Sequence, residues 1–339
     1  MSTGARLAPV ITLCLLLCAT SGGCASGLRL SLLAAAAEPP SRVALFFSVD
    51  TPGARTSRGR RAAVPVANLQ ASDFRIYEDG ALVSELDSQQ TIAHPELAVE
   101  HYTLLLIDMS STTVLGDQLG AIRSAAQAWL TQLRTLQRVA VYAFDGSKSL
   151  YEIVPFDSAQ SLDKLRSFEV VDPSTNLNGA VLLALAELDK TLQTHSMPVR
   201  LGSLVVLTDG VDRANRVSQR QMLDVVDAAP YHVYTLGIGR ELDDSLLARV
   251  GKSGYVRVED SSSARIAFRE LTQLITTASR RFYLLRYCSP SRGGTHTVRV
   301  EVATPAGSGQ LQYNLDASHF SAGCDAQAVV APPSLRRIH

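Results

Sequence analysis

Residues 103–112 read Thr-Leu-Leu-Leu-Ile-Asp-Met-Ser-Ser-Thr, a short apolar run that ends in an acidic residue and three hydroxyl side chains. A continuous apolar run bounded by polar residues is typical of a strand buried on both faces. Similar runs occur at 138–144, 203–207, 231–236 and 255–258. The sequence therefore predicts a sheet whose strands lie inside the protein.

Between these runs lie segments with apolar residues at steps of three and four, the spacing of one face of a helix. The clearest are residues 115–133 and 177–188, and further helices are expected at 242–250 and 264–279. Strands that alternate with helices favour a parallel, doubly wound sheet covered by helices on both faces. We therefore expect an α/β domain over residues 101–280.

The segments on either side of this domain have the shorter alternations of β-strands. Residues 41–100 contain strand-like runs and the turn signal Asp79-Gly80, and strand patterns return over residues 281–325. The simplest arrangement is a small β-domain built from both flanks. Residues 326–339 follow as a tail that we expect to be disordered.

The composition is that of a protein that folds. Hydrophobic residues make up 46% of the 339-residue chain and charged residues 19%, which is ordinary globular usage. The 32 Lys and Arg residues balance the 32 Asp and Glu residues. Because no excess of positive charge favours a nucleic acid, we expect no nucleic-acid partner.

The N-terminus has the pattern of an export signal. An apolar run over residues 7–19 is too short for a confident membrane span but suits the core of a secretory signal. Residues 21–24, Ser-Gly-Gly-Cys, then resemble the lipobox of bacterial lipoproteins, although Ser21 stands where that motif usually has Leu. The resemblance implies a signal over residues 1–24, acylation of Cys24 and a membrane-anchored protein of the cell envelope.

A second cleavage site is also possible. Residues 35–37, Ala-Ala-Ala, resemble an ordinary signal-peptidase site, and cleavage after Ala37 would release a soluble periplasmic or secreted protein. The sequence leaves both outcomes open, and both predict export.

The five cysteines fit an exported chain. Cys14 and Cys18 would leave with the signal, and Cys24 would carry the lipid. Cys288 and Cys324 remain as an even pair, which an oxidising compartment would join in a disulfide. The alternative is two unrelated reduced thiols.

Polar residues follow the predicted strands in a way that suggests a metal site. Asp108 directly follows the first apolar run, and Asp209 follows the run at 203–207 and Thr208. Thr175 lies in a polar loop before the second long helix. The carboxyl ends of parallel strands share one edge of the sheet, where ligands bind in such folds. Two carboxylates and several hydroxyls would therefore meet there, and these oxygens suit Mg²⁺.

The order Asp108-x-Ser110-x-Thr112, then Thr175, then Asp209 resembles the metal-ion-dependent adhesion site (MIDAS) of von Willebrand factor type A (VWA) domains. Thr112 replaces the second serine of that motif. The resemblance implies that Ser110 and Thr112 bind Mg²⁺, or Ca²⁺ or Mn²⁺, directly. It implies that Thr175 binds directly or through water, and that Asp108 and Asp209 hold metal-bound waters. A carboxylate of a partner protein would complete the coordination.

The flanks extend the resemblance. Residues 68–80 and 283–290 are similar to segments of bacterial exported proteins related to this domain. The resemblance implies a metal-dependent protein-binding or adhesion module that is not an enzyme. A metal-free structural or scaffolding protein of the cell envelope remains the alternative.

A phosphatase of the haloacid dehalogenase type is a more remote alternative. That family needs an acidic residue two positions after its nucleophilic aspartate, and Ser110 occupies that place after Asp108. The sequence also lacks a Gly-x-Ser-x-Gly motif and a phosphate-binding loop. His101, His195 and His232 do not have metal-ligand spacing, so we assign them no role.

Overall fold

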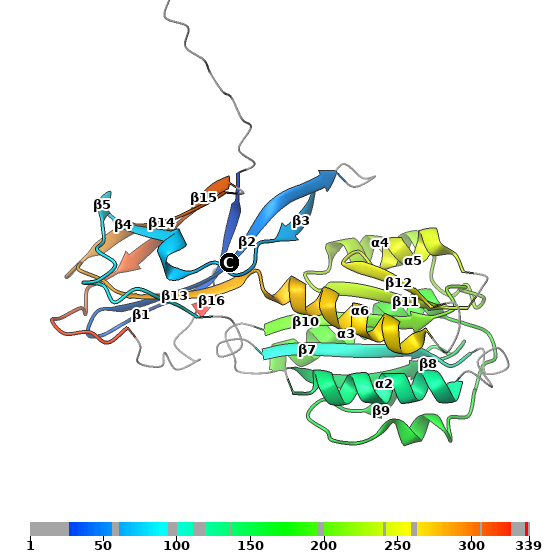
Figure 1. Cartoon of the computed structure of the whole chain (residues 1–339). Helices are drawn as coiled ribbons and strands as arrows, with labels where there is room; N and C mark the ends of the chain where they lie inside the picture. The colour runs from blue at the N-terminus through cyan, green and yellow to red at the C-terminus, as the bar shows by residue number, and fades with distance from the viewer. Residues whose placement is uncertain are drawn as a thin grey trace, which may run out of the picture.

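The computed structural model describes residues 27–55, 61–93, 100–110, 119–135, 137–194, 200–239, 242–258, 263–305, 307–326 and 336–337. These residues form an α/β unit and a β-sandwich that lie end to end (Figure 1). The sandwich is built from both ends of the chain and the α/β unit from its middle.

A six-stranded sheet forms the centre of the α/β unit. Its strands lie in the order β12-β11-β10-β7-β8-β9. Only β9 is antiparallel to its neighbour. The bounds are β7 Glu100–Asp108, β8 Arg138–Phe144, β9 Tyr151–Val154, β10 Arg200–Thr208, β11 His232–Ile238 and β12 Gly254–Val258. The strand order reverses between β7 and β10, so a topological switch point lies at their carboxyl ends.

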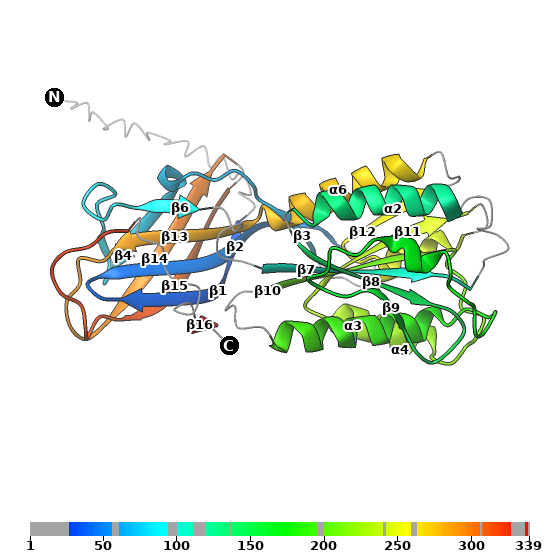
Figure 2. The ribbon, with the colours of Figure 1, turned by 90° about the horizontal axis from the view of Figure 1, so that it is seen from below.

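Helices cover both faces of this sheet, as Figure 2 shows. Helices α2 (Leu119–Leu133) and α6 (Ala264–Ser279) lie on one face, where Trp129 packs on Phe268. Helices α3 (Leu177–Thr194), α4 (Gln219–Ala228) and α5 (Asp244–Val250) lie on the other, and a short 3₁₀ helix spans Leu162–Leu165. Both faces of β7 are buried, which explains its continuous apolar run. The predicted doubly wound α/β fold is confirmed.

Two antiparallel sheets pack face to face in the sandwich. One has the order β16-β1-β2-β13-β6, with β3 also pairing with β2, and the other has the order β15-β14-β4-β5. A 3₁₀ helix, Ala71–Asp73, precedes β4. The strand bounds are β1 Arg29–Glu38, β2 Arg42–Arg55, β3 Arg61–Pro65, β4 Phe74–Glu78, β5 Ala81–Leu82, β6 Thr91–Ala93, β13 Phe282–Cys288, β14 Thr295–Thr304, β15 Gly307–Asp316 and β16 Arg336–Arg337. The predicted small β-domain from both flanks is therefore present.

Strand β1 begins before the β segment that the sequence predicted to start at residue 41. It pairs with β2 along its length, and Ala34, Ala35 and Ala36 are buried. The short β16 pairs with β1 inside the tail that we expected to be disordered. Most of that tail, like Cys24, lies outside the described residues.

The predicted disulfide joins Cys288, at the end of β13, to Cys324, with their Cα atoms 5.9 Å apart. Thirty-six positions separate the two cysteines. The bond therefore ties β13 to the segment that follows β15.

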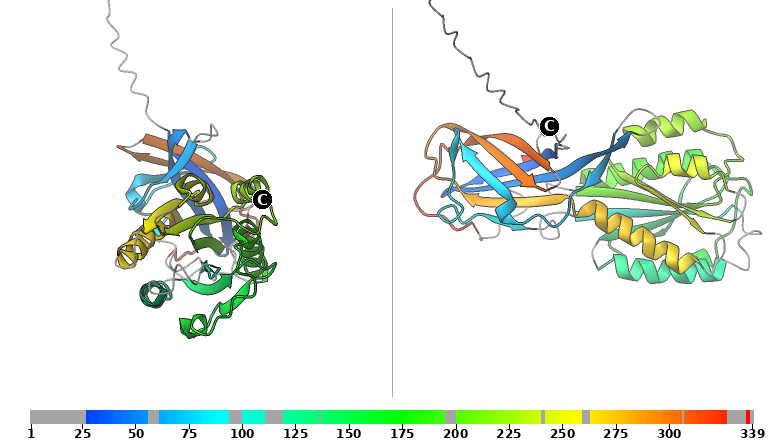
Figure 3. Two further views of the ribbon diagram at one scale, coloured as in Figure 1. Left: turned by 90° about the vertical axis from the view of Figure 1, so that its right-hand side faces the viewer. Right: turned by 45° about the horizontal axis from the view of Figure 1, so that its top comes forward.

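The amino ends of the parallel strands face the sandwich. Arg281, between α6 and β13, pairs with Asp50 of β2 at 3.1 Å. The burial of His232, at the start of β11, and the nearby charge of Arg281 lower the pKa of that histidine. The carboxyl ends consequently lie at the end of the molecule far from the sandwich (Figure 3). No helix in the described part of the chain is both long and apolar enough to cross a membrane.

Candidate metal centre

Asp108 is the last residue of β7 and is 3% exposed. Its Oδ1 accepts hydrogen bonds from the Ser110 hydroxyl at 2.5 Å and from the Ser110 backbone N–H at 3.1 Å. Its Oδ2 accepts one from the hydroxyl of Thr208 at 2.7 Å. The carboxylate thus joins the loop after β7 to the end of β10.

Thr175 comes from a loop of the chain that lies elsewhere in sequence. It is 1% exposed and stands two residues before α3. Its Oγ1 lies 2.6 Å from the Oγ of Ser110. The structure therefore brings together Asp108, Ser110 and Thr175, three of the five residues predicted to form the metal site.

Asp209 joins the group from the third loop. It follows Thr208 at the end of β10 and is half-buried. The same loop folds over the Thr175 segment, since the backbone N–H groups of Arg213 and Ala214 both donate to the Thr175 carbonyl at 2.9 Å. Thr112, the remaining predicted ligand, lies outside the described residues.

The environment of Asp108 is buried and negative. The pKa of this carboxyl is raised to about 6. Burial is the main cause and the nearby charge of Asp209 a smaller one, while hydrogen bonds from Ser110 and Thr208 lower the pKa. Every neighbour that lowers this pKa is a neutral donor. Two carboxyl groups close together in a buried site favour a cation between or beside them.

The donor set suits a hard divalent ion. It consists of hydroxyl and carboxylate oxygens, the ligands that Mg²⁺ and Ca²⁺ prefer. Neighbouring ligands of an octahedral Mg²⁺ with bonds of about 2.1 Å are about 3 Å apart. The 2.6 Å between the Ser110 and Thr175 oxygens is close to that spacing. No group of three or more His, Cys, Asp or Glu side chains forms a metal site among the described residues.

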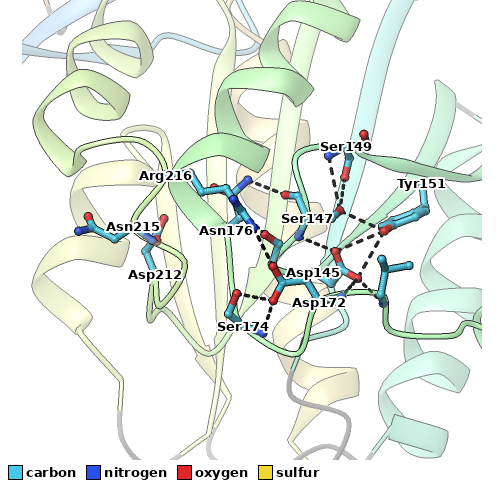
Figure 4. Close-up of polar contacts among 12 residues, drawn as sticks. Asp145, Ser147, Ser149, Tyr151, Asp172, Ser174, Asn176, Asp212, Asn215 and Arg216 are labelled. Atoms are coloured by element: carbon cyan, nitrogen blue, oxygen red, sulfur yellow. Dashed lines mark hydrogen bonds and ion pairs between the residues drawn. The ribbon is translucent and has the colours of Figure 1, made fainter.

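A second polar cluster lies beside this site, and the sequence analysis did not identify it (Figure 4). Its centre is Asp145, which directly follows β8 and is fully buried. Its carboxylate accepts hydrogen bonds from the backbone N–H groups of Ser147 and Val171 at 2.8 Å and of Asp172 at 3.1 Å. Asp145 follows an apolar run just as Asp108 and Asp209 do, and that was the available signal.

Arg216 connects this cluster to the third loop. Its Nε donates to the Gly146 carbonyl at 2.7 Å, and its terminal nitrogen pairs with an Asp172 oxygen at 2.8 Å. The side-chain amide of Asn176 donates to the Ser147 carbonyl at 2.7 Å. Nothing in the local sequence around Arg216 indicates these contacts, because they join segments 44 and 70 positions apart.

Comparison with known proteins gives neighbours at the level of structure. No protein-family model matches the chain, and no curated protein sequence matches it. A von Willebrand factor type A protein from Catenulispora acidiphila is 11% identical, with 85% of this chain and 73% of that one covered and a TM-score of 0.43. Proximal thread matrix protein 1 from the mussel byssus, with a zinc-occupied MIDAS motif, is 14% identical, with 53% and 49% covered and a TM-score of 0.43.

The pilus adhesin SpaC from Lactobacillus rhamnosus GG is 9% identical, with 86% of this chain and 47% of that one covered and a TM-score of 0.41. The chain thus spans about half the length of the mussel protein and of the adhesin. The solved structures that this chain resembles include von Willebrand factor type A domains, the family that its Asp-x-Ser-x-Thr motif indicated.

Proposed function

We propose that the chain is a protein-binding module that holds a divalent cation, Mg²⁺ or else Ca²⁺ or Mn²⁺, at Asp108, Ser110, Thr112, Thr175 and Asp209. The hydrogen bond between the hydroxyls of Ser110 and Thr175 is the observation that supports this most directly, because the Ser110 hydroxyl is also hydrogen-bonded to buried Asp108. It joins loops 65 residues apart at the switch point of the sheet.

Each residue has a distinct part in this proposal. The hydroxyls of Ser110, Thr112 and Thr175 would be neutral ligands, so the ion would keep much of its positive charge. Asp108 and Asp209 would hold metal-bound waters and balance part of that charge. A bound ion would then offer one coordination position to a carboxylate of the partner protein.

We propose that the chain binds and does not catalyse. If the chain were a phosphatase of the haloacid dehalogenase type, Asp108 would be the nucleophile and Ser110 would stand where the general acid is needed. A serine hydroxyl is a poor proton donor at neutral pH. Both oxygens of Asp108 also accept hydrogen bonds from neighbouring side chains, which lowers their reactivity as nucleophiles.

Calorimetric titration of MgCl₂ and MnCl₂ into the mature chain, after treatment with chelator, tests the metal site. Wild type should give a binding heat, and its unfolding free energy should rise by about 2.7 kcal/mol when the ion is present at a hundred times its Kd. Asp108→Asn keeps the shape of the side chain but removes its charge. It should lose both responses, and without metal it should be at least as stable as wild type, because a buried carboxylate has been neutralised.

Asp224→Asn, an exposed residue on α4, is the matched control and should behave as wild type. Equal heats in wild type and Asp108→Asn would remove the metal assignment. The metal-free scaffold would then be the better explanation.

We also propose that the chain is exported and anchored to a membrane through Cys24. The fold supports this over cleavage after Ala37, because that cut would remove all of β1 except Glu38. Ala34 and Ala36 of β1 pack with residues of β2 and β13 on one face of their own sheet. Ala35 contributes to the core between the two sheets. Removing them would expose the partner strand β2 and open the core.

Mass spectrometry of the N-terminal peptide from producing cells checks this. We expect a first residue of Cys24 that carries the added mass of a lipid, and we expect Cys24→Ser to move the protein out of the membrane fraction. A mature chain that begins at Glu38 would contradict the anchor and would mean that the sandwich tolerates the loss of β1.

A further inference from the structure

The loop that carries Thr175 is attached to its neighbours at several points that do not involve the metal site. We call residues 171–176 the Thr175 loop and residues 145–150 the β8–β9 loop. We infer that Arg216 is a positioning residue. It links the Thr175 loop to the β8–β9 loop by hydrogen bonds, and this link sets the affinity of the candidate site for its metal ion. This inference rests on the proposed metal site.

Asp145 holds both ends of the Thr175 loop through hydrogen bonds. Its buried carboxylate accepts from the N–H groups of Val171 and Asp172 at the start of the Thr175 loop. Its carbonyl accepts from the N–H of Asn176 at the end of the loop at 3.1 Å. The N–H of Gly146 also donates to the Asp172 carbonyl at 3.0 Å. Both ends of the Thr175 loop are therefore tied to the end of β8.

Arg216 adds hydrogen bonds from a third loop. It lies in the loop after β10, and its guanidinium reaches the Gly146 carbonyl of the β8–β9 loop and the carboxylate of Asp172 in the Thr175 loop at the same time. Figure 4 shows this side chain between the two loops. The planar guanidinium has donors on separate nitrogens, so it can make both bonds together, whereas a lysine ammonium has only one donor centre.

The closeness of the two loops shows that this contact is tightly packed. A Cβ atom at Gly146 would lie 2.1 Å from the Ser174 hydroxyl and 2.5 Å from an Asp172 carboxylate oxygen. The same Asp172 oxygen accepts from the Ser174 hydroxyl at 2.6 Å. A side chain at position 146 would therefore displace the Ser174 hydroxyl and the Asp172 carboxylate, and Ser174 is the residue next to Thr175.

The position of the Thr175 hydroxyl thus depends on contacts that Arg216 completes. Without the guanidinium, Asp172 keeps its bonds to Ser174 but loses its link to the loop after β10. The Thr175 oxygen would then sample more positions relative to Ser110, and an ion would have to order the loop when it binds. Groups that orient metal ligands in this way typically alter affinity by about ten- to a hundredfold.

The Arg216–Asp172 pair is about one-third exposed on both sides, so it should contribute little to the stability of the whole domain. A loss of metal affinity without a loss of melting temperature therefore separates positioning from a merely structural role.

The experiment uses the mature chain with Arg216→Ala, Arg216→Lys and the control Arg220→Ala, an exposed arginine on α4 that pairs with Asp224. Hydrogen exchange in chelator follows the backbone N–H groups of residues 171, 172 and 174–176, since Pro173 has none, and calorimetry gives the Kd for Mg²⁺. We expect Arg216→Ala to speed exchange in this loop and to weaken Mg²⁺ binding about tenfold. Arg216→Lys should lie between it and wild type, and Arg220→Ala should match wild type.

Unchanged exchange in Arg216→Ala, or faster exchange with an unchanged Kd, would overturn the positioning role while the metal site stood. A wild-type protein that binds no Mg²⁺ would overturn the metal site itself, and with it this inference. Gly146→Ala gives a second arm that leaves Arg216 intact, and it should likewise weaken Mg²⁺ binding because its Cβ displaces Ser174.

Discussion

The hydroxyl of Thr208 has two hydrogen-bonding roles at the candidate site. It donates to Asp108 at 2.7 Å and accepts from the backbone N–H of Gly210 at 3.0 Å. It therefore orients the buried carboxylate and the turn that leads out of β10. The residue types of this site could be predicted, because carboxylates and hydroxyls stood at strand ends. Their mutual hydrogen bonds could not, because Thr208 and Asp108 are 100 positions apart.

No role was predicted for His101 from the sequence, and in the structure its buried ring is hydrogen-bonded. It lies near the start of β7, 8% exposed, with its Nε2 2.8 Å from the Ser203 hydroxyl. Burial lowers its pKa to about 3, with a smaller contribution from nearby His232. The folded protein therefore keeps this ring neutral well below the ordinary pKa of histidine.

We expect the free energy of unfolding to fall as the pH drops below the ordinary histidine pKa of about 6.5. Between that value and the folded pKa of about 3, the unfolded chain binds a proton at His101 that the folded chain does not. The cost should reach about 2 kcal/mol at pH 5. In urea unfolding at pH 7 and pH 5, His101→Gln should reduce the difference between the two pH values by about this amount.

His319→Gln, at an exposed position, is the control and should leave that difference unchanged. His232 keeps its own contribution in both variants, since burial and the charges of Arg281 and Lys252 lower its pKa to about 4. A pH dependence that His101→Gln does not alter would mean that water reaches the ring in the folded state.

Among the elements, the strands of the α/β sheet were the easiest to predict. The apolar run at 138–144 corresponds to β8, and the run at 231–236 lies within one or two residues of β11. Such strands have helices on both faces, so nearly every position must be apolar and the pattern is unambiguous. The helices between them follow the three- and four-residue spacing for the same reason, since one face of each packs on the sheet.

Strand β1 was missed because of its small side chains. Its run of alanines looks like a signal-peptidase site, and alanine has a low preference for strands. The structure explains the small residues through crowding on both faces of the sheet. Ala34 and Ala36 pack near Phe46 and Phe282, while Ala35 lies against the core that contains Phe47. Only the tertiary packing reveals that need.

The positions of the loops beside the candidate metal site were predicted, but their structure was not. Topology alone places the ends of β7, β8 and β10 on one edge. The attachment of residues 171–176 to Asp145 depends on backbone N–H groups, which every residue except proline carries. Sequence patterns depend on side chains, so they do not indicate contacts made by backbone N–H groups.

At the scale of the whole molecule, the two units have separate hydrophobic cores. The α/β unit has one core on each face of its sheet, and the sandwich has its main core between its two sheets. The Arg281–Asp50 pair and the packing of Leu201 near β1 and β2 connect the units. The candidate metal site and the disulfide lie in different units, at positions far apart in the fold.

This separation predicts that metal and disulfide stabilise different parts of the chain. Scanning calorimetry of the mature protein should show two transitions, because each core can unfold cooperatively by itself. Chelator should lower only the transition of the α/β unit, since only that unit would lose a bound ion. A Cys288→Ala/Cys324→Ala variant should lower only the transition of the sandwich. Opening a loop of 36 positions should reduce its stability by about 3 to 4 kcal/mol.

The assignment of each transition follows from which treatment moves it, and Asp108→Asn provides the check. In that variant the chelator should have no effect, while loss of the disulfide should still lower the transition of the sandwich by the same amount as in wild type. A single transition that shifts with both treatments would mean that the contacts around Arg281 couple the units into one cooperative structure. In that case an ion bound at the far edge of the sheet would also stabilise the sandwich, and with it the strand that follows the proposed membrane anchor.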